Sequence, residues 1–236
     1  MIRNYNFNDI EESDKMNDKI ENIFVENIKT LKEFDEEYRK VILGVDEAGR
    51  GPLAGPVVAG AVIIPKYFEE LDEINDSKKL SEKKRNKLYN IIMEKCIVGV
   101  GVANEREIDD INILNATFLA MKRAIQEIKL KKLNIRYELT LVDGNHEIKG
   151  YNEPQKCVIK GDGKSLSIAS ASIIAKVTRD AIMKEIGSKY PVYQFEKHKG
   201  YGTKIHRESI IENGPCEHHR KSFLKNILKE EEMKIF

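Results

Sequence analysis

Residues 41–51 read VILGVDEAGRG, an apolar run followed at once by two acids and a glycine-rich turn. The run Val41–Val45 is short and apolar, which is typical of a buried strand. Because successive side chains on a strand point to opposite faces, Asp46 and Glu47 can share one site only if the chain leaves the strand there. Two glycines shortly after these acids permit such a bend. The stretch therefore predicts a pair of carboxylates at the carboxyl end of a strand.

Two further acids follow apolar runs later in the chain. Asp143 closes the run Leu139–Val142, and Asp162 stands between two glycines after Val158–Ile159. Taken singly, each acid is better explained as an ordinary turn residue, because Asp beside Gly is a common turn signal. Together, acids at three strand ends favour a shared site, since α/β sheets bind their ligands at strand ends.

A cluster of carboxylates points to bound cations. Acids buried near each other repel and cannot all ionise without compensating positive charge. Mg²⁺ or Mn²⁺ supplies that charge and prefers oxygen ligands. Two such ions, about 3.5–4 Å apart, can clamp the attacking and leaving oxygens of a phosphodiester displacement. The candidate catalytic and metal-binding residues are Asp46, Glu47, Asp143 and Asp162.

The remaining periodicity predicts strands and helices around these acids. Further strands are expected at 56–64 and 96–103, and helices at 81–95, 112–130 and 166–186. The first half of the last helix is rich in Ala and Ser, so another backbone can approach it closely. The order of elements indicates an α/β fold with its site at strand ends.

Charge divides the 236-residue chain unevenly. The formal net charge is only +1, but residues 1–40 sum to −4 and residues 156–207 to +7. Residues 1–40 are polar with sparse apolar positions at helical spacing, and we expect a helical N-terminal extension there. Residues 41–236 are expected to form the catalytic domain, with helices at its C-terminal end. The basic segment suits a phosphate-rich ligand, or it is a lysine-rich solvated surface.

Several classes of protein are disfavoured by the sequence. Cys96, Cys157 and Cys216 are scattered and form no C-x-x-C pair, so neither a disulfide framework nor a zinc knuckle is expected. Free thiols fit a reducing cytosol, and a cytoplasmic location is expected. The first seven residues lack the apolar core of a signal peptide. The longest weakly polar run, 51–65, is too short and too interrupted by Pro and Gly to span a bilayer.

Three further motifs are candidate substrate contacts. The glycines of Gly49-Arg50-Gly51 allow a ligand close to the backbone, although a tight turn explains this motif about as well. Residues 76–80, DSKKL, offer a hydroxyl, two ammonium groups and a helix N-terminus to a phosphate, although capping of the next helix by Ser81 explains part of the motif. Residues 198–203, HKGYGT, place Tyr201 between glycines in the basic region, where it could stack on a sugar or base or pack in the core.

Taken together, these segments resemble the ribonuclease HII family. The resemblance covers roughly residues 41–225, and its motifs occur in the family's order. They are VDEAGRGPLAGP (45–56), DSKKLS (76–81), LVDG (141–144), KGDGKS (160–165), IASASIIAKVTRD (168–180), HKGYGT (198–203) and HRKSF (219–223).

The resemblance implies a ribonuclease H-like fold with a mixed central sheet flanked by helices. It implies that Asp46, Glu47, Asp143 and Asp162 hold two metal ions, and that hydrolysis leaves a 3′-hydroxyl and a 5′-phosphate. The expected substrates are RNA–DNA hybrids and duplex DNA cut on the 5′ side of a single ribonucleotide.

The resemblance also implies roles for the substrate contacts. Residues 49–51 would read the ribose 2′-hydroxyl, which only RNA carries. Tyr201 would stack at the junction between ribonucleotide and deoxyribonucleotide, and Lys78 would contact a phosphate. Ser77 and Lys199, from the same motifs, complete the expected substrate contacts.

Two departures and three alternatives remain. A proline expected shortly after Phe223 is absent, and residues 1–40 lie outside the shared core. A ribonuclease HIII-like enzyme would usually carry a larger N-terminal domain and lack Arg50. A non-catalytic hybrid-binding protein has no reason to keep four mutually repelling acids. A junction resolvase does not account for the Gly-Arg-Gly turn together with Tyr201. A monomer is expected.

Overall fold

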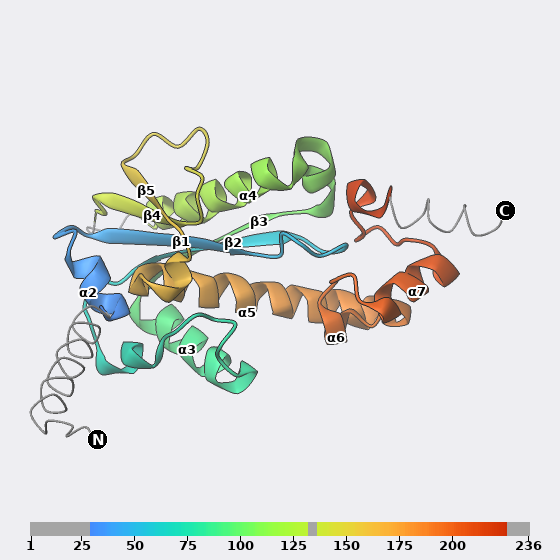
Figure 1. Ribbon diagram of the computed structural model, residues 1–236, viewed down its shortest axis with the longest axis horizontal. Coiled ribbons are helices and arrows are strands. Elements are labelled where there is room, and N and C mark those ends of the chain that lie inside the picture. Colours follow the sequence, from blue (N-terminus) through green and yellow to red (C-terminus); the bar gives the residue numbers. More distant parts are fainter. Residues whose placement is uncertain (1–28, 132–135, 226–236) are drawn as a thin grey trace, which may run out of the picture.

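The chain forms a five-stranded mixed sheet in the order β3-β2-β1-β4-β5 (Figure 1). The computed structural model describes residues 29–131 and 136–225. β1 pairs antiparallel with β2 and parallel with β4, while β2–β3 is antiparallel and β4–β5 is parallel. The strands are β1 (Ile42–Ala48), β2 (Val57–Ile63), β3 (Ile97–Ala103), β4 (Leu139–Asp143) and β5 (Gln155–Val158). The expected α/β class with a mixed central sheet is confirmed.

Helices cover both faces of this sheet (Figure 1). α4 packs on one face, and α5, backed by α3, packs on the other. The α-helices are α2 (Leu31–Glu36), α3 (Glu82–Lys95), α4 (Glu105–Leu130), α5 (Leu166–Lys189), α6 (Phe195–His198) and α7 (Lys204–Asn213). Short 3-10 turns are η1 (Glu69–Glu73), η2 (Gly161–Gly163) and η3 (Pro191–Tyr193).

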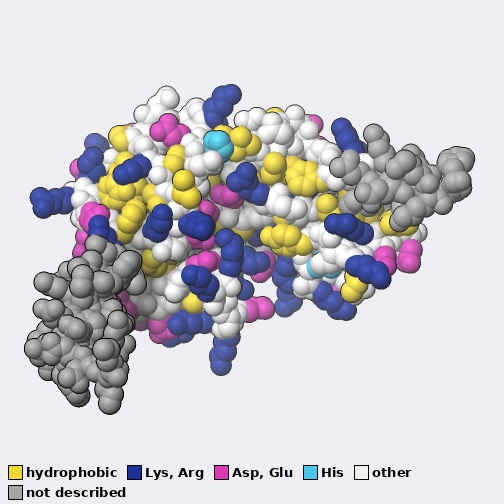
Figure 2. Space-filling view, in the orientation of Figure 1, with side chains coloured by type: hydrophobic (Ala, Val, Ile, Leu, Met, Phe, Trp, Pro, Cys, Tyr) yellow, Lys and Arg dark blue, Asp and Glu magenta, His cyan; other side chains and the backbone are white. Residues whose placement is uncertain are grey.

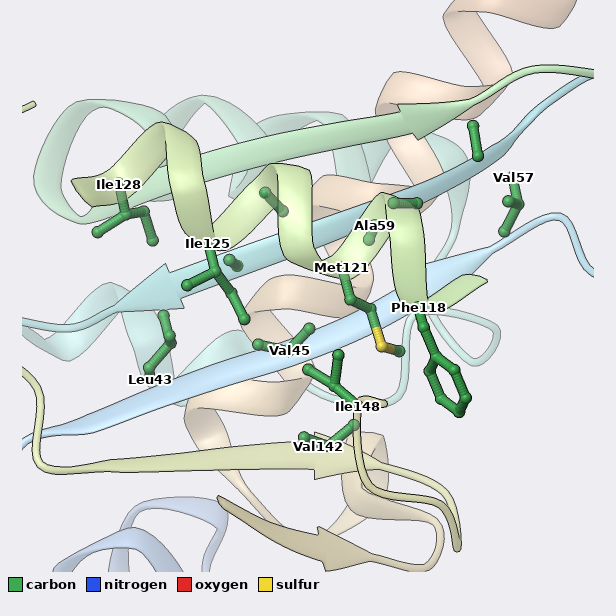
Figure 3. Packing of buried hydrophobic residues seen from close by; sticks show 14 of the residues in the cluster. Leu43, Val45, Val57, Ala59, Phe118, Met121, Ile125, Ile128, Val142 and Ile148 are labelled. Atoms are coloured by element: carbon green, nitrogen blue, oxygen red, sulfur yellow. The ribbon is translucent and has the colours of Figure 1, made fainter. Parts of the chain in front are cut away.

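The larger hydrophobic core lies between α4 and the sheet (Figure 3). Leu43 and Val45 of β1 meet Met121 and Ile125 of α4 there, all at most 2% exposed. Fully burying one such side chain contributes about 1.5–3 kcal/mol, whereas an exposed ion pair contributes about 0–1 kcal/mol. The core therefore outweighs the many surface ion pairs in holding the sheet.

The opposite face of the sheet approaches α5 through two glycines. A Cβ on Gly44 would lie 2.1 Å from the carbonyl carbon of Ser167, and one on Gly60 would lie 2.4 Å from the carbonyl oxygen of Ala171. Only glycine on the strands and small residues on the helix allow this spacing. The predicted close approach of another backbone to α5 is confirmed, and it brings α5 directly behind the acids of β1.

The sequence located most elements to within a few residues. The helix expected at 81–95 is α3, and the side chain of Ser81 accepts a hydrogen bond from the N–H of Lys84, so the predicted N-cap is confirmed. The helix expected at 166–186 runs on to Lys189.

The expected exit from the first strand was wrong, and leaving the strand is not required for the two acids to interact, because repulsion from Glu47 contributes to the raised pKa of Asp46. β1 continues to Ala48, because Asp46 and Glu47 still pair with Gly60 and Ala59 of β2. The chain leaves the ladder only at Gly49, whose φ of +100° is open to glycine and costly for other residues.

Two other boundaries also differ. α4 runs from Glu105, where Asn104 and Glu107 form a capping box, but its backbone is broken at Asn112 (φ 64°, ψ 165°), so the helix expected at 112–130 is the second part of α4. The fifth strand was expected at 158–159 but spans Gln155–Val158, and Ile159 is 62% exposed.

Of the expected N-terminal extension, the structure describes residues 29–40 only. Thr30 and Glu33 cap α2 reciprocally. One carboxylate oxygen of Asp35 accepts hydrogen bonds from both the N–H (2.8 Å) and the hydroxyl (2.7 Å) of Ser167. This part of the extension is therefore attached to the first turn of α5.

Two other expectations bear on the described residues. The three cysteines are free thiols. None of the helices within residues 29–131 and 136–225 is both long enough and apolar enough to cross a bilayer.

Candidate active site

The four acids come from three neighbouring segments of the fold. Asp46 and Glu47 lie near the end of β1, and Asp143 is the last residue of β4. Since Val45 pairs in parallel with Val142, Asp46 and Asp143 occupy neighbouring positions on adjacent strands. Asp162 lies in η2, which follows β5. The sheet therefore brings Asp46 next to Asp143, which is 97 positions away in the sequence.

The electrostatics confirm that these carboxylates influence one another. Asp46 is 4% exposed, and burial followed by repulsion from Glu47 and Asp143 raises its pKa well above its ordinary value. Burial also raises the pKa of Glu47, against the favourable charge of Arg50. The pKa of Asp143 is raised by burial, with Asp162 adding repulsion. Such shifts mark a site where negative charge accumulates.

Hydrogen bonds and two cations hold the carboxylates in this arrangement. The N–H of Glu47 donates to Asp46 at 2.7 Å, and the N–H of Gly161 donates to Asp143 at 2.6 Å. Lys78 Nζ lies 3.3 Å from an oxygen of Asp162. Arg50 Nη1 lies 3.4 Å from an oxygen of Glu47. Both cations are themselves well exposed, so they remain accessible to a phosphate.

The chemistry of the four acids fits a hard divalent cation. All the available donors are carboxylate oxygens, which Mg²⁺ and Mn²⁺ prefer. Within residues 29–131 and 136–225, however, no three Asp, Glu, His or Cys side chains are already arranged around one ion position. Their present partners, backbone N–H groups and two basic side chains, account for this spread, because each satisfies one carboxylate separately.

A pocket of about 320 Å³ adjoins the acids. It collects six of the seven expected substrate contacts, and Lys199 is not among its lining residues. The Ser77 hydroxyl is 2% exposed and lies 2.9 Å from that of Ser172, so it faces α5 as much as the pocket. The lining residues are Glu47, Ala48, Gly49, Arg50, Gly51, Ser77, Lys78, Ser172, Lys176, Arg179 and Tyr201.

Three polar lining residues were not assigned to the site from the sequence. Ser172, Lys176 and Arg179 stand on one face of α5 at helical spacing. Polar residues at this spacing within an otherwise small and apolar helix were a signal that could have found them. Ser172 also opposes the rise in the pKa of Asp46 through a hydrogen bond.

Tyr201 lies at the rim of the pocket, and a buried histidine holds its backbone by a hydrogen bond. The side chain of Tyr201 is 46% exposed. Its carbonyl oxygen lies 2.9 Å from Nδ1 of His206, which is fully buried. The Lys199 ammonium donates instead to the carbonyl of Glu196. The aromatic ring is thus displayed on a fixed backbone, and the neighbouring lysine is engaged elsewhere.

Basic side chains surround this region of the surface. Figure 2 shows Lys and Arg side chains gathered over α3 and beside the middle of α5. The strand ends that carry the acids lie close to this basic surface, and such a surface suits a polyanionic ligand.

Comparisons with known proteins agree with one another. The family profile described as Ribonuclease HII matches residues 43–226. A ribonuclease HII of Fusobacterium nucleatum is 62% identical over 202 residues, covering 85% of this chain and 93% of that protein. A ribonuclease HII of Caldicellulosiruptor saccharolyticus is 56% identical over 207 residues, covering 86% and 97%.

Solved structures show the same fold. The ribonuclease H2 of Pyrococcus horikoshii OT3 superposes with a TM-score of 0.63 at 29% identity, over 81% of this chain and 97% of that one. Bst-RNase HIII in complex with Mn²⁺ also reaches 0.63, at 20% identity, over 82% of this chain and 70% of that one. The second likeness supports the fold alone.

Proposed function

This chain belongs to the ribonuclease HII family and is an endoribonuclease, and from that membership we propose its substrates and its catalytic residues. It hydrolyses the RNA strand of RNA–DNA hybrids and cuts duplex DNA on the 5′ side of a single embedded ribonucleotide. The products carry a 3′-hydroxyl and a 5′-phosphate. The observation that carries the proposal is one pocket beside the carboxylate cluster, in which Glu47 of that cluster meets a glycine turn and an exposed aromatic ring.

Asp46, Glu47, Asp143 and Asp162 are proposed to hold two divalent ions, Mg²⁺ or Mn²⁺. When bound, the ions would stabilise the attacking and leaving oxygens of the phosphodiester. The carboxylates supply the negative charge that keeps the ions in place, and the raised pKa values of Asp46 and Asp143 reflect how strongly that charge requires compensation. The side chains must turn from their N–H and basic partners to meet around the ions.

Substrate recognition falls to the other side of the pocket. Residues 49–51 lie at the backbone turn after β1, where hydrogen-bonding groups of the main chain can reach a ribose 2′-hydroxyl. Tyr201 offers its ring to the sugar at the ribonucleotide–deoxyribonucleotide junction. Lys78, which is well exposed at its ammonium group, binds a backbone phosphate. Ser77 and Lys199 support these contacts indirectly, since the structure engages both with protein groups.

The alternative of a ribonuclease HIII-like enzyme is not favoured. The fold itself does not discriminate, because representatives of both enzymes superpose with the same TM-score. The sequence does discriminate, because the curated relatives that match most of the chain at 56–62% identity are ribonucleases HII. A purely hybrid-binding protein is disfavoured because keeping buried, repelling acids costs stability and gains nothing without catalysis.

The test is cleavage of a DNA duplex that carries one ribonucleotide, in Mg²⁺ or Mn²⁺, with the cut mapped to the nucleotide. We expect a cut on the 5′ side of the ribonucleotide and a 5′-phosphate on the downstream product. An RNA–DNA hybrid should be cut within its RNA strand, and an all-DNA duplex should stay intact. Cutting of the all-DNA duplex, or no cutting of either ribonucleotide substrate, would contradict the proposal.

A further inference from the structure

Two buried arginines lie behind the loop that follows β1. Arg220 is fully buried, and its guanidinium donates to the carbonyl oxygens of Gly49 (2.6 Å), Arg50 (3.0 Å) and Gly55 (2.9 Å). Arg179, 1% exposed, donates to the carbonyls of Pro56, Ala54 and Lys199. One guanidinium therefore holds the Gly-Arg-Gly turn, and the other holds the end of the same loop and the segment before Tyr201.

Neither guanidinium has a carboxylate partner within ion-pair distance among the described residues. Burial lowers the pKa of Arg220 to about 9, which still leaves it a cation at neutral pH. A buried charge without an ion-pair partner is costly, and only hydrogen bonds to backbone carbonyls offset that cost here. An apolar side chain could fill this space without the penalty, so the guanidinium has a role beyond filling volume.

The effect of Arg220 on the turn follows from peptide geometry. In a trans peptide the C=O and the next N–H point in opposite directions. Because Arg220 holds the carbonyls of Gly49 and Arg50 on the buried side, the N–H groups of Arg50 and Gly51 point away from it. Within the described residues neither of these N–H groups donates a hydrogen bond. Both residues line the pocket, whereas Arg220 does not.

The turn cannot easily relax into another orientation. A Cβ on Gly49 would lie 2.0 Å from Nε of Arg179, so the loop is packed directly on the second guanidinium. Arg220 is itself fixed, because its N–H donates to the carbonyl of Leu53 at 2.9 Å. The next two residues are anchored on α4, where Asp109 accepts from the N–H groups of Lys221 and Ser222.

We propose that Arg220 is a positioning residue for recognition of the 2′-hydroxyl: by holding two carbonyls of the turn, it presents the N–H groups of Arg50 and Gly51 to the ribose. Arg220 touches no substrate. The inference rests on the proposed function, in which residues 49–51 read the ribose. It adds that selectivity for a ribonucleotide over a deoxyribonucleotide depends on the guanidinium of Arg220, in the C-terminal part of the chain.

Binding without metal separates selectivity from catalysis and from folding. Fluorescence anisotropy in EDTA would give the Kd of the full-length protein for a DNA duplex with one ribonucleotide and for the matched all-DNA duplex. The ratio of the Kd for the all-DNA duplex to the Kd for the ribonucleotide duplex is independent of the fraction of protein that is folded. For Arg220→Lys, which keeps the charge but cannot hold several carbonyls at once, we expect this ratio to fall by about tenfold.

Arg123→Lys is the control, because Arg123 also donates to a backbone carbonyl, that of Val102, but does not line the pocket. It should preserve the ratio, whatever its effect on the melting temperature. If Arg220→Lys keeps the wild-type ratio, Arg220 is a structural residue and the inference is wrong. If the wild-type protein itself does not distinguish the two duplexes, the proposed function fails instead.

A measurement on the wild-type protein avoids any folding defect of the variants. Amide NMR signals of Arg50 and Gly51 should shift when the ribonucleotide duplex is added and stay near their free positions with the all-DNA duplex. Shifts confined to other amides, or identical shifts with both duplexes, would overturn the inference.

Discussion

Asp46 illustrates at the scale of one residue how a catalytic group is kept at the expense of stability. It is the least exposed of the four acids, and its neighbours Glu47 and Asp143 are also acidic. The pKa of Asp46 is higher in the folded protein than in the unfolded chain. The stability that this group contributes is therefore present in acid and is lost as the pH rises through the folded-state pKa. Above its ordinary pKa, the burial of this carboxyl group therefore opposes folding.

This reasoning predicts two opposite effects of Asp46→Asn. Cleavage should be abolished, because the carboxylate that would hold metal is gone. The melting temperature at pH 7 should rise, because the group whose ionisation is opposed by burial and repulsion is removed. In thermal unfolding the gain should grow as the pH rises above the ordinary value of 3.8, because the unfolded wild type then ionises more readily than the folded protein. Glu208→Gln, which removes an exposed acid paired with Lys204, is the control and should change neither property. Near-normal cleavage by Asp46→Asn would refute the metal-binding role.

Tyr201→Ala should separate substrate reading from chemistry. The ring is exposed at the pocket rim and touches no carboxylate, and stacking on one base is worth about 1–3 kcal/mol. Its loss should reduce kcat/KM at a lone ribonucleotide by about 10–100-fold. Cleavage within a continuous hybrid, which lacks that junction at most positions, should suffer less. Tyr201→Phe keeps the ring and should stay close to wild type. Equal losses on both substrates would leave Tyr201 as a packing residue.

At the scale of elements, the contact between the sheet and α5 positions the site. Gly60 pairs with Asp46 across β1 and β2 and lies against the backbone of Ala171. One residue further along α5, Ser172 counters the rise in the pKa of Asp46. Any change in the spacing between the sheet and α5 must therefore also move the groups that set the environment of Asp46.

Gly60→Ala tests this coupling. The added methyl would lie 2.4 Å from the Ala171 carbonyl, so α5 must move, at a cost of about 1–3 kcal/mol. We expect a lower free energy of unfolding in urea and reduced kcat in the protein that remains folded. Gly163→Ala is the stability control, because a Cβ there meets nothing within 4 Å. If Gly60→Ala lost stability but kept full kcat, the spacing would not matter for catalysis.

Also at the scale of elements, His198, His206 and His219 form a histidine cluster beneath the loop that carries Tyr201. His206 stacks on His198 with ring centroids 4.4 Å apart, and its Nε2 lies 3.1 Å from Nε2 of His219. Burial lowers the pKa of both His206 and His219 to about 4, with mutual repulsion adding to the effect on His219. Both rings are therefore neutral in the folded protein at pH 7.

These shifts fix the direction of a pH effect on stability. Because the folded-state pKa values lie below the unfolded value of 6.5, the stability these rings contribute is present above pH 6.5 and is lost as the pH falls towards 4. The melting temperature of wild type should drop over this range more steeply than that of His206→Gln, which does not titrate at that position. Parallel curves for the two proteins would show that the cluster does not govern acid sensitivity.

At the scale of the whole molecule, segments from both parts of the chain brace the central sheet. α2 is attached to the first turn of α5 by Asp35, whose carboxylate also suits the positive end of that helix. Residues 218–222 run back to the loop after β1 and to α4. The site thus lies between these two attached segments. Only the C-terminal one, residues 218–222, contacts residues that line the pocket, namely Gly49 and Arg50.

A chain that begins at Arg39 should therefore keep its activity and lose stability. It lacks the hydrogen bonds of Asp35 to Ser167, each of which is worth about 0.5–1.5 kcal/mol net, since burial opposes the charge of Asp35 and raises its pKa. We expect kcat/KM on the hybrid to be unchanged at 25 °C and the melting temperature to fall. Asp35→Ala in the full chain should reproduce much of that fall. A folded truncated protein without activity would show that the extension takes part in the reaction.

The sequence by itself determined the local features of this protein. Apolar runs such as Val41–Val45 specify buried strands wherever they are placed, and Ser81 caps its helix through its own neighbours. The acids at strand ends could be recognised because strand and acid are adjacent in the chain. The pairing of Asp46 with Asp143 at one site also followed, since ligand sites of α/β sheets form at strand ends.

Only the tertiary structure decided the features that depend on distant partners. β1 extends through its acids because β2 pairs with it, and no local pattern encodes that length. Lys199, expected at the substrate, turns to a carbonyl beside it. Arg220 lies in the motif HRKSF, but nothing in that motif shows what it contacts, and its burial against Gly49 across 171 positions exists only once the chain has folded. Hydrogen bonds to backbone carbonyls need no particular residue type at the acceptor, so the sequence does not reveal the partner.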